Sequence, residues 1–125
     1  FPDFYRAEVR RWWGDWHRVY GEAGIAGIWN DMNEPAGWKR AWYVGDGVIP
    51  LGEQDPGRAT HQLEDGRSVP HAAVRNAYGH LENQATYEGL LRLRPDERPF
   101  VLTRSAFAGT QRWAAQWTGD VCSTW

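Results

Sequence analysis

The sequence has a single cysteine, Cys122, and no excess of charge of either sign. One thiol excludes an internal disulfide and argues against a zinc site built from cysteines. With 14 basic and 16 acidic side chains, the net charge of −2 provides neither the basic surface of a nucleic-acid-binding domain nor a polybasic membrane anchor. No apolar run approaches the roughly 18 residues that a membrane-spanning helix needs. The four histidines lack metal-binding spacing, so we expect no metal or other cofactor.

What the sequence does contain is tryptophan, with nine among 125 residues. Tryptophan at this density is typical of a sugar-binding surface or of a strongly aromatic core. A hydrophobic share of 42% excludes a disordered segment, and the length allows one domain at most. One hypothesis is therefore a Trp-rich carbohydrate-binding module without catalytic activity, which would fold as a β-sandwich.

The periodicity of the apolar residues favours a different fold, with helices. Apolar residues at three- and four-residue steps predict an amphipathic helix from about residue 5 to residue 20. A second helical stretch is predicted from about residue 73 to residue 93, with apolar positions at Tyr78, Leu81, Ala85, Leu90 and Leu91.

Short apolar runs at residues 25–29 and 100–103 are typical of buried strands, and each is followed abruptly by polar residues. A third strand is expected at residues 116–120, after a helical turn near residues 111–115. Residues 36–70 are rich in Gly, Pro, Asp and Arg without a clear period, which predicts a long loop or a small insertion.

Strands that alternate with helices predict an α/β fold with a parallel sheet covered on both faces. Polar residues follow the strands, and in (β/α)8 barrels the carboxyl ends of the strands carry the functional site. A complete barrel needs about 250 residues, so three strands cannot close one. We therefore expect residues 1–125 to form part of a (β/α)8 TIM barrel, about three central β/α units of a longer protein.

Two aspartates, Asp31 and Asp120, each end a predicted strand near a tryptophan, Trp29 or Trp117. Paired carboxylates with aromatic neighbours suit the cleavage of a glycosidic bond, in which one carboxylate attacks and the other donates a proton. Either aspartate could instead cap a helix or stabilise a turn. Their spacing alone leaves both interpretations open.

Several motifs resemble those of glycoside hydrolase family 31, the α-glucosidase family. The segment GIWNDMNEP at residues 27–35 closely resembles the family's nucleophile signature. Further segments resemble the family in the same order along the chain: FPDF at residues 1–4, YEGLL at 87–91, RPFVLTRSAFAG at 98–109 and WTGD at 117–120. The resemblance covers nearly the whole chain and is weakest at residues 39–70.

The resemblance implies roles for individual residues. Asp31 would be the nucleophile that forms a covalent glycosyl-enzyme, and Asp120 the general acid and base, with retention at the anomeric carbon. Arg104 would donate hydrogen bonds to sugar hydroxyls, with an ion pair to a nearby carboxylate as the alternative. The remaining site residues would wall the sugar pocket (Trp29, Met32, Trp117), border the leaving-group subsite (Trp38) or support the site without reacting (Glu34).

The function that follows from this resemblance is a retaining α-glucosidase acting on α-glucosides or α-gluco-oligosaccharides. The sequence Met32-Asn33-Glu34 favours glucosidases, because the α-xylosidase branch usually carries Phe-Gly-Glu there. An α-xylosidase or an α-transglucosylase remains an alternative. Linkage and chain-length specificity, oligomeric state and compartment stay open.

Overall fold

The computed structural model describes residues 1–36, 41–44, 47–50 and 59–122. At its centre is a three-stranded parallel sheet in the order β1 (Gly27–Asn30), β6 (Phe100–Thr103), β7 (Ala115–Gln116). Gly27 pairs with Phe100 and Asn30 with Thr103, so β1 and β6 end at the same edge. Two of the strands predicted from the sequence are thus confirmed. The third is shorter than expected and ends four residues before Asp120.

The helices also match the predicted periodicity in outline. Their bounds are α1 (Ala7–Trp16), α2 (Arg18–Glu22), α3 (His71–Val74) and α4 (Tyr78–Leu93), with 3-10 turns η2 (Arg75–Ala77) and η3 (Thr110–Arg112). The first predicted helix is divided at His17, and the second begins as α3 and η2 before α4. Among the described helices, none is long and apolar enough to cross a membrane.

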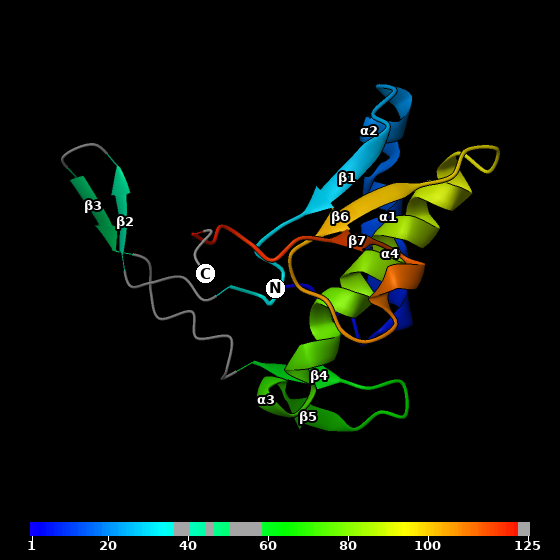
Figure 1. Ribbon diagram of the computed structural model, residues 1–125. Coiled ribbons are helices and arrows are strands. Elements are labelled where there is room, and N and C mark those ends of the chain that lie inside the picture. The colour runs from blue at the N-terminus through cyan, green and yellow to red at the C-terminus, as the bar shows by residue number, and fades with distance from the viewer. Residues whose placement is uncertain (37–40, 45–46, 51–58, 123–125) are drawn as a thin grey trace.

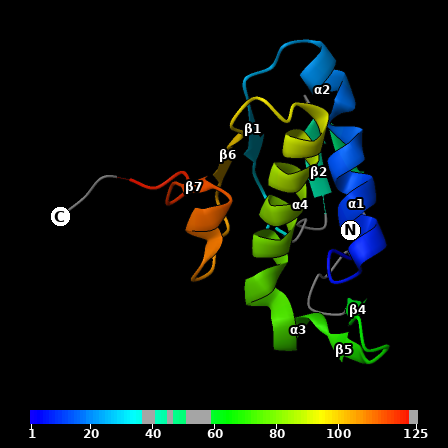
Figure 2. The same cartoon turned by 90° about the vertical axis from the view of Figure 1, so that its right-hand side faces the viewer.

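Among the described residues, helices cover one face of the sheet, which corrects the prediction of two covered faces. Helix α4 packs on β1 and β6, and α1 packs beside α4 (Figures 1 and 2). Trp29 and Phe100, which point to the other face, are 61% and 56% exposed. In a (β/α)8 barrel the helices form the outer ring and the second face of the sheet is the interior of the barrel. The sheet is therefore an open piece of such a barrel.

The segment predicted as a loop or insertion contains two antiparallel hairpins. Strand β2 (Ala41–Val44) pairs with β3 (Gly47–Pro50), and β4 (Thr60–Gln62) pairs with β5 (Ser68–Pro70). The β4–β5 hairpin lies beside α3 (Figure 1). These strands are too short for a periodic signal, which is why the sequence did not predict them.

An aromatic core joins the start of the chain to α1 and α4. Phe4 is 1% exposed, and its ring lies edge-on to Trp13 at 5.3 Å and to Tyr78 at 5.1 Å between centroids. Only part of the apolar face predicted for the first helix packs against this core. Val9 and Trp13 pack against this core, whereas four further positions are exposed (Trp12, Trp16, Val19 and Tyr20).

Helices α1 and α4 approach each other at a pair of glycines, Gly14 and Gly89. A Cβ atom added to Gly14 would lie 2.8 Å from the Cα of Gly89, and one added to Gly89 would run into the backbone of Gly14. We expect Gly89→Ala to lower the free energy of unfolding by about 1–3 kcal/mol, because neither backbone can yield.

The matched control is Gly21→Ala in α2, where an added Cβ meets nothing within 4 Å. This substitution should leave stability unchanged or raise it by up to about 1 kcal/mol. Denaturant unfolding of the full-length protein measures both effects. Equal unfolding midpoints for Gly89→Ala and the wild type would contradict the close approach.

Candidate active site

Three loops leave the sheet at its carboxyl edge. Asp31, Arg104 and Trp117 are the first residues after β1, β6 and β7. The backbone N–H of Arg104 donates to the carbonyl oxygen of Asn30 at 3.2 Å, and that of Trp117 to the oxygen of Thr103 at 3.3 Å. These bonds continue the parallel ladder past the strand ends. They place the three loops next to one another, at the edge where the sequence predicts the site.

The guanidinium group of Arg104 contacts two carboxylates at this edge. Its Nε and Nη2 atoms donate to the two carboxylate oxygens of Glu34 at 2.9 and 3.0 Å, and Nη1 lies 3.3 Å from Oδ1 of Asp31. The hydrogen bond to Glu34 raises the pKa of Arg104. Burial opposes this rise, and the charges of Glu34, Asp31 and Asp120 add to it. The Arg104 cation therefore contacts the carboxylates of Asp31 and Glu34, and the charge of Asp120 also acts on it.

Both carboxylate oxygens of Glu34 accept hydrogen bonds from Arg104. Burial raises the pKa of its carboxyl group, but hydrogen bonds from Arg104 and from the backbone outweigh burial and hold that pKa below its ordinary value. Glu34 is therefore ionised at neutral pH and paired face to face with the guanidinium group. The ion pair that the sequence analysis left open for Arg104 is present, with Glu34 as the main partner.

Asp31 lies at a sharp turn of the backbone. Its Oδ1 atom accepts a hydrogen bond from the backbone N–H of Met32 at 2.7 Å, and its side chain is 35% exposed. Met32 has a φ of +59°, in the left-handed region that non-glycine residues rarely adopt. The turn fixes the direction in which the carboxylate leaves β1.

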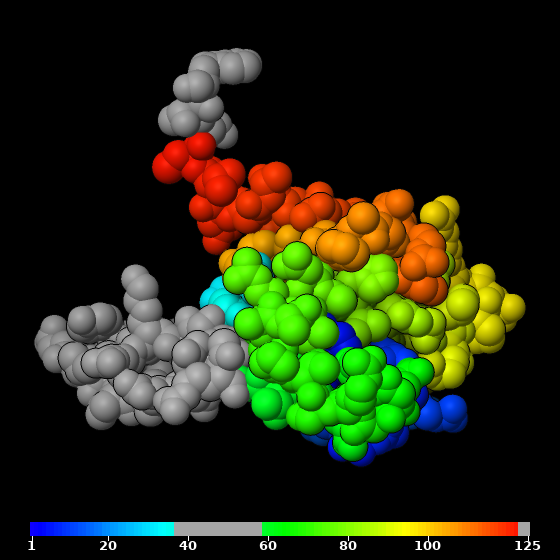
Figure 3. Space-filling model, turned by 90° about the horizontal axis from the view of Figure 1, so that it is seen from below, coloured from blue at the N-terminus to red at the C-terminus, as the bar shows by residue number. Residues whose placement is uncertain are grey.

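Asp120 is carried by a loop that passes against Arg104. The preceding residue, Gly119, has a φ of +88°, and a Cβ added there would lie 3.3 Å from Cδ of Arg104. The positive φ favours glycine here, and a Cβ atom would also be tight against the Arg104 side chain. This part of the chain follows β7 and extends beyond the helices, as the orange-to-red atoms of Figure 3 show.

Two tryptophans contact each other on the face of the sheet that α4 does not cover. The rings of Trp29 and Trp117 meet edge to face, with centroids 5.3 Å apart and planes inclined by 70°. Trp29 is 61% exposed and Met32 is 43% exposed, so neither side chain belongs to the core. Trp38, the remaining predicted contact, lies outside the described residues.

Sequence reasoning missed a layer of buried polar side chains beneath this edge. They come from the ends of β1 and β6 (Asn30 and Thr103), from the loop after β1 (Asn33) and from α4 (Glu82, Asn83 and Thr86), and each is at most 8% exposed. Leu91, one of the apolar positions used to predict this helix, is 41% exposed. The overlooked signal is the spacing of Gly79, Glu82, Asn83 and Thr86, which places four non-aliphatic residues on one helix face.

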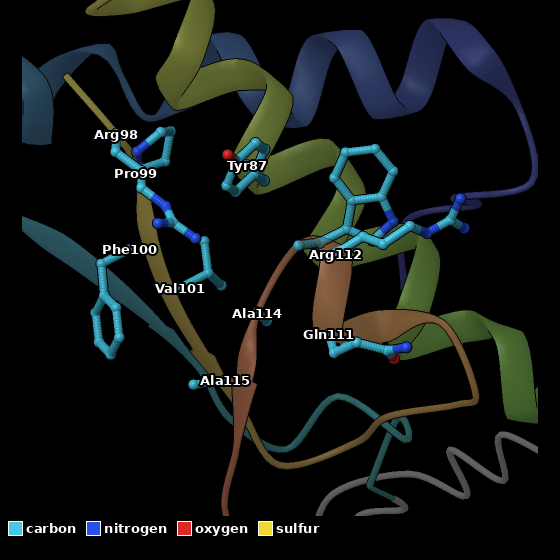
Figure 4. A pocket seen from close by; sticks show the side chains of 10 residues that line it. Tyr87, Arg98, Pro99, Phe100, Val101, Gln111, Arg112, Ala114 and Ala115 are labelled. Atoms are coloured by element: carbon cyan, nitrogen blue, oxygen red, sulfur yellow. The ribbon is translucent and has the colours of Figure 1, made fainter.

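A cavity beside the sheet lies away from this edge. It has a volume of about 540 Å³ and is lined by α4, η3 and the first residues of β6 and β7, Phe100 and Ala115 (Figure 4). None of the predicted site residues lines it. Catalytic residues of (β/α)8 barrels lie at the carboxyl ends of the strands, so we assign no chemistry to this cavity. Within the described part of the chain, no cluster of three or more His, Cys, Asp or Glu side chains could hold a metal ion.

Comparison with known proteins relates this arrangement to a family of enzymes. The chain is 42% identical over 125 residues to "Alpha-glucosidase 2" of Bacillus thermoamyloliquefaciens and 37% identical over 134 residues to "Alpha-glucosidase" of Saccharolobus solfataricus. Each match covers the whole chain but only 14% and 19% of the relative's own length. The chain therefore corresponds to a small part of these proteins.

Solved structures of two related enzymes also resemble the chain. A GH31 dextranase of Flavobacterium johnsoniae, complexed with glucose, matches 94% of the chain with a TM-score of 0.67 and 29% identity, over 13% of its own length. A family 31 α-glucosidase of Bacteroides thetaiotaomicron matches 96% of the chain with a TM-score of 0.60 and 38% identity, over 16% of its own length. The family model described as "Glycosyl hydrolases family 31 TIM-barrel domain" matches residues 1–125. The chain thus belongs to glycoside hydrolase family 31 and forms part of its TIM-barrel domain.

Proposed function

We propose that these residues form the catalytic centre of a retaining α-glucosidase, which removes terminal α-linked glucose by double displacement. The observation that carries the proposal is the bridge that Arg104 makes between Asp31 and Glu34, at the edge where the Asp120 loop also arrives. Family membership supports glycoside hydrolysis, and the names of the most similar relatives support α-linked glucose.

In the first step Asp31 attacks the anomeric carbon as the glycosidic C–O bond breaks. Both described contacts of its carboxylate, to Met32 and to Arg104, are made by Oδ1, so we assign the attack to Oδ2. Asp120 donates a proton to the departing oxygen. The products are a free alcohol or shortened sugar and a β-glucosyl ester of Asp31.

In the second step water replaces the ester. Asp120, now ionised, takes a proton from the water as the water oxygen attacks the anomeric carbon. The C–O bond to Asp31 breaks and the carboxylate is restored. Two inversions give net retention, so the released sugar is α-glucose.

The sugar ring would rest on the open face of the sheet. The exposed Trp29, the half-buried Trp117 that it contacts and the exposed Met32 offer apolar surface for the C–H groups of the ring. Arg104 is held by Glu34 and offers its remaining N–H groups to a sugar hydroxyl. Glu34 therefore acts as a support, and Trp38 remains a sequence-based prediction for the leaving-group subsite.

The structure contradicts one of the alternative functions and is compatible with the other two. The carbohydrate-binding module required a β-sandwich, and this prediction is wrong because the described residues form a parallel sheet with a 16-residue helix packed on it. An α-xylosidase or an α-transglucosylase would use the same carboxylates with another sugar or another acceptor. The likeness to a dextranase adds α-linked glucan as a further substrate class of the same chemistry.

The test is the stereochemistry of the first product. We expect proton NMR of a short α-glucoside, mixed with the full-length protein, to show α-glucose before the anomers equilibrate. A sample with Asp31→Ala is the control and should show no product. If β-glucose formed first, the reaction would be an inversion and Asp31 would not be its nucleophile. Absence of cleavage for every α-glucoside tried would contradict the proposed substrate class.

A further inference from the structure

Asn83 is a completely buried side chain on α4, directly beneath the edge that carries Asp31 and Arg104. Its Oδ1 atom accepts a hydrogen bond from Nδ2 of Asn30 at 2.8 Å, and Asn30 is the residue before Asp31. Its Nδ2 atom donates hydrogen bonds to Thr103 and Ser105, the two neighbours of Arg104 in the sequence. These bonds measure 2.9 Å to Oγ1 of Thr103 and 3.3 Å to the carbonyl oxygen of Ser105.

The hydroxyl group of Thr103 completes this network. It accepts hydrogen bonds from Nδ2 of Asn83 and from Nδ2 of Asn33, both at 2.9 Å, and it donates to the carbonyl oxygen of Ser105 at 2.9 Å. A hydroxyl group has one donor and two acceptor positions, so its capacity is filled. Asn33 also accepts a hydrogen bond from the backbone N–H of Ser105 at 2.9 Å. A buried network that is satisfied in this way favours a single arrangement of its members.

Helix α4 has little freedom to move beneath the two loops. A Cβ added to Gly79, one turn before Asn83, would lie 2.8 Å from the carbonyl oxygen of Asn33 and 2.8 Å from Cβ of Ser105. The helix therefore touches the loop after β1 and the loop after β6 at the same place. Groups held by a rigid helix are positioned more accurately than groups held by loops alone.

We propose that Asn83 is a positioning residue that sets the distance between the Asp31 carboxylate and the Arg104 guanidinium group. It acts through Asn30 on one side and through Thr103 and Ser105 on the other, and it lies beneath the sugar site without contacting the sugar. The inference rests on the proposed function, because it needs Asp31 to be the nucleophile. Misplacement of a reacting group by about 1 Å can cost about 100-fold in rate.

The experiment measures formation of the glycosyl-enzyme in the full-length protein, with a fluorinated glucosyl fluoride whose ester hydrolyses slowly. Mass spectrometry locates the label, and the time course separates the maximal labelling rate from the affinity for the reagent. We expect Asn83→Leu and Asn83→Asp to lower the maximal rate about 100-fold with little change in affinity. Asn83→Asp is nearly isosteric, and it replaces the N–H groups that reach Thr103 and Ser105 with the second oxygen of a buried carboxyl group. Asn83→Ser replaces Asn83→Leu if that variant does not fold.

The matched control is Trp13→Phe, which removes the 3.0 Å hydrogen bond from Nε1 of Trp13 to Oγ1 of Thr86 in the same buried region. This variant should lose thermal stability and keep the labelling rate of the wild type. If the Asn83 variants lose stability in the same way and label Asp31 at the wild-type rate, the positioning role is wrong and the proposed function stands. If the wild type carries no label on Asp31, both the proposed function and this inference are wrong.

Discussion

Replacement of Asp31 by alanine is expected to lower kcat for an α-glucoside by at least about 10,000-fold, the largest effect of any substitution considered. Loss of a nucleophile costs about this much in other hydrolases, because the remaining groups bind and polarise the substrate without forming the covalent intermediate. Arg104 and Glu34 would still pair in the variant, since their hydrogen bonds do not involve Asp31. The loss should therefore appear in kcat rather than in stability.

An external nucleophile gives this prediction a second readout. In Asp31→Ala, azide can enter the space of the carboxylate and attack an activated α-glucoside once, which yields β-glucosyl azide. The control Asp96→Ala changes an exposed aspartate in the loop before β6, at the opposite edge of the sheet, and should retain full activity. Retention of more than about 1% of wild-type kcat by Asp31→Ala would rule out Asp31 as the nucleophile.

The second largest effect is expected for Asp120→Ala, and it should depend on the leaving group. An unactivated disaccharide needs a proton on its departing oxygen, so we expect kcat/KM to fall by about 100- to 10,000-fold, the usual contribution of a general acid. Glucosyl fluoride releases fluoride with little acid assistance. For that substrate the loss in kcat/KM should be small.

The stereochemistry of azide rescue distinguishes the two aspartates. In Asp120→Ala the glycosyl-enzyme on Asp31 still forms, and azide attacks it from the face that water would use. The product is α-glucosyl azide, the opposite anomer from that of the Asp31 variant. An equal loss of kcat/KM for the disaccharide and the fluoride would contradict a general-acid role for Asp120.

Much of the fold could be predicted from the sequence because its signals are local. An apolar run that stops at polar residues marks both the strand and the edge where its functional side chains lie, and residues 100–103 form the predicted strand without change. The same pattern located Asp31 and Arg104 at one edge of the sheet. The pairing of Arg104 with Glu34 depends on side-chain geometry, so the sequence could only offer it as an alternative.

The polar face of α4 could not be predicted for a physical reason. Asn83 and Thr86 are 0% exposed, yet amide and hydroxyl side chains at helical spacing usually mark a solvent-facing surface. Their burial is stable only because partners arrive from β1 and β6, which are distant in sequence. The reverse holds for Trp12 and Trp16, which are apolar at helical spacing but exposed, because Gly14 sets the face that α1 turns toward α4.

The hairpins between β1 and α4 have a consequence for how this domain can vary. The chain leaves the sheet at Asp31, forms the β2–β3 and β4–β5 hairpins, and continues into α3. The entropic cost of closing such an excursion grows only with the logarithm of its length, by about 0.6 kcal/mol for each doubling. Lengthening or shortening of the chain here costs the barrel little. Because the excursion starts beside Asp31, the proposed nucleophile, it offers a place where the surroundings of the proposed site can change while the parallel sheet and α4 stay as they are.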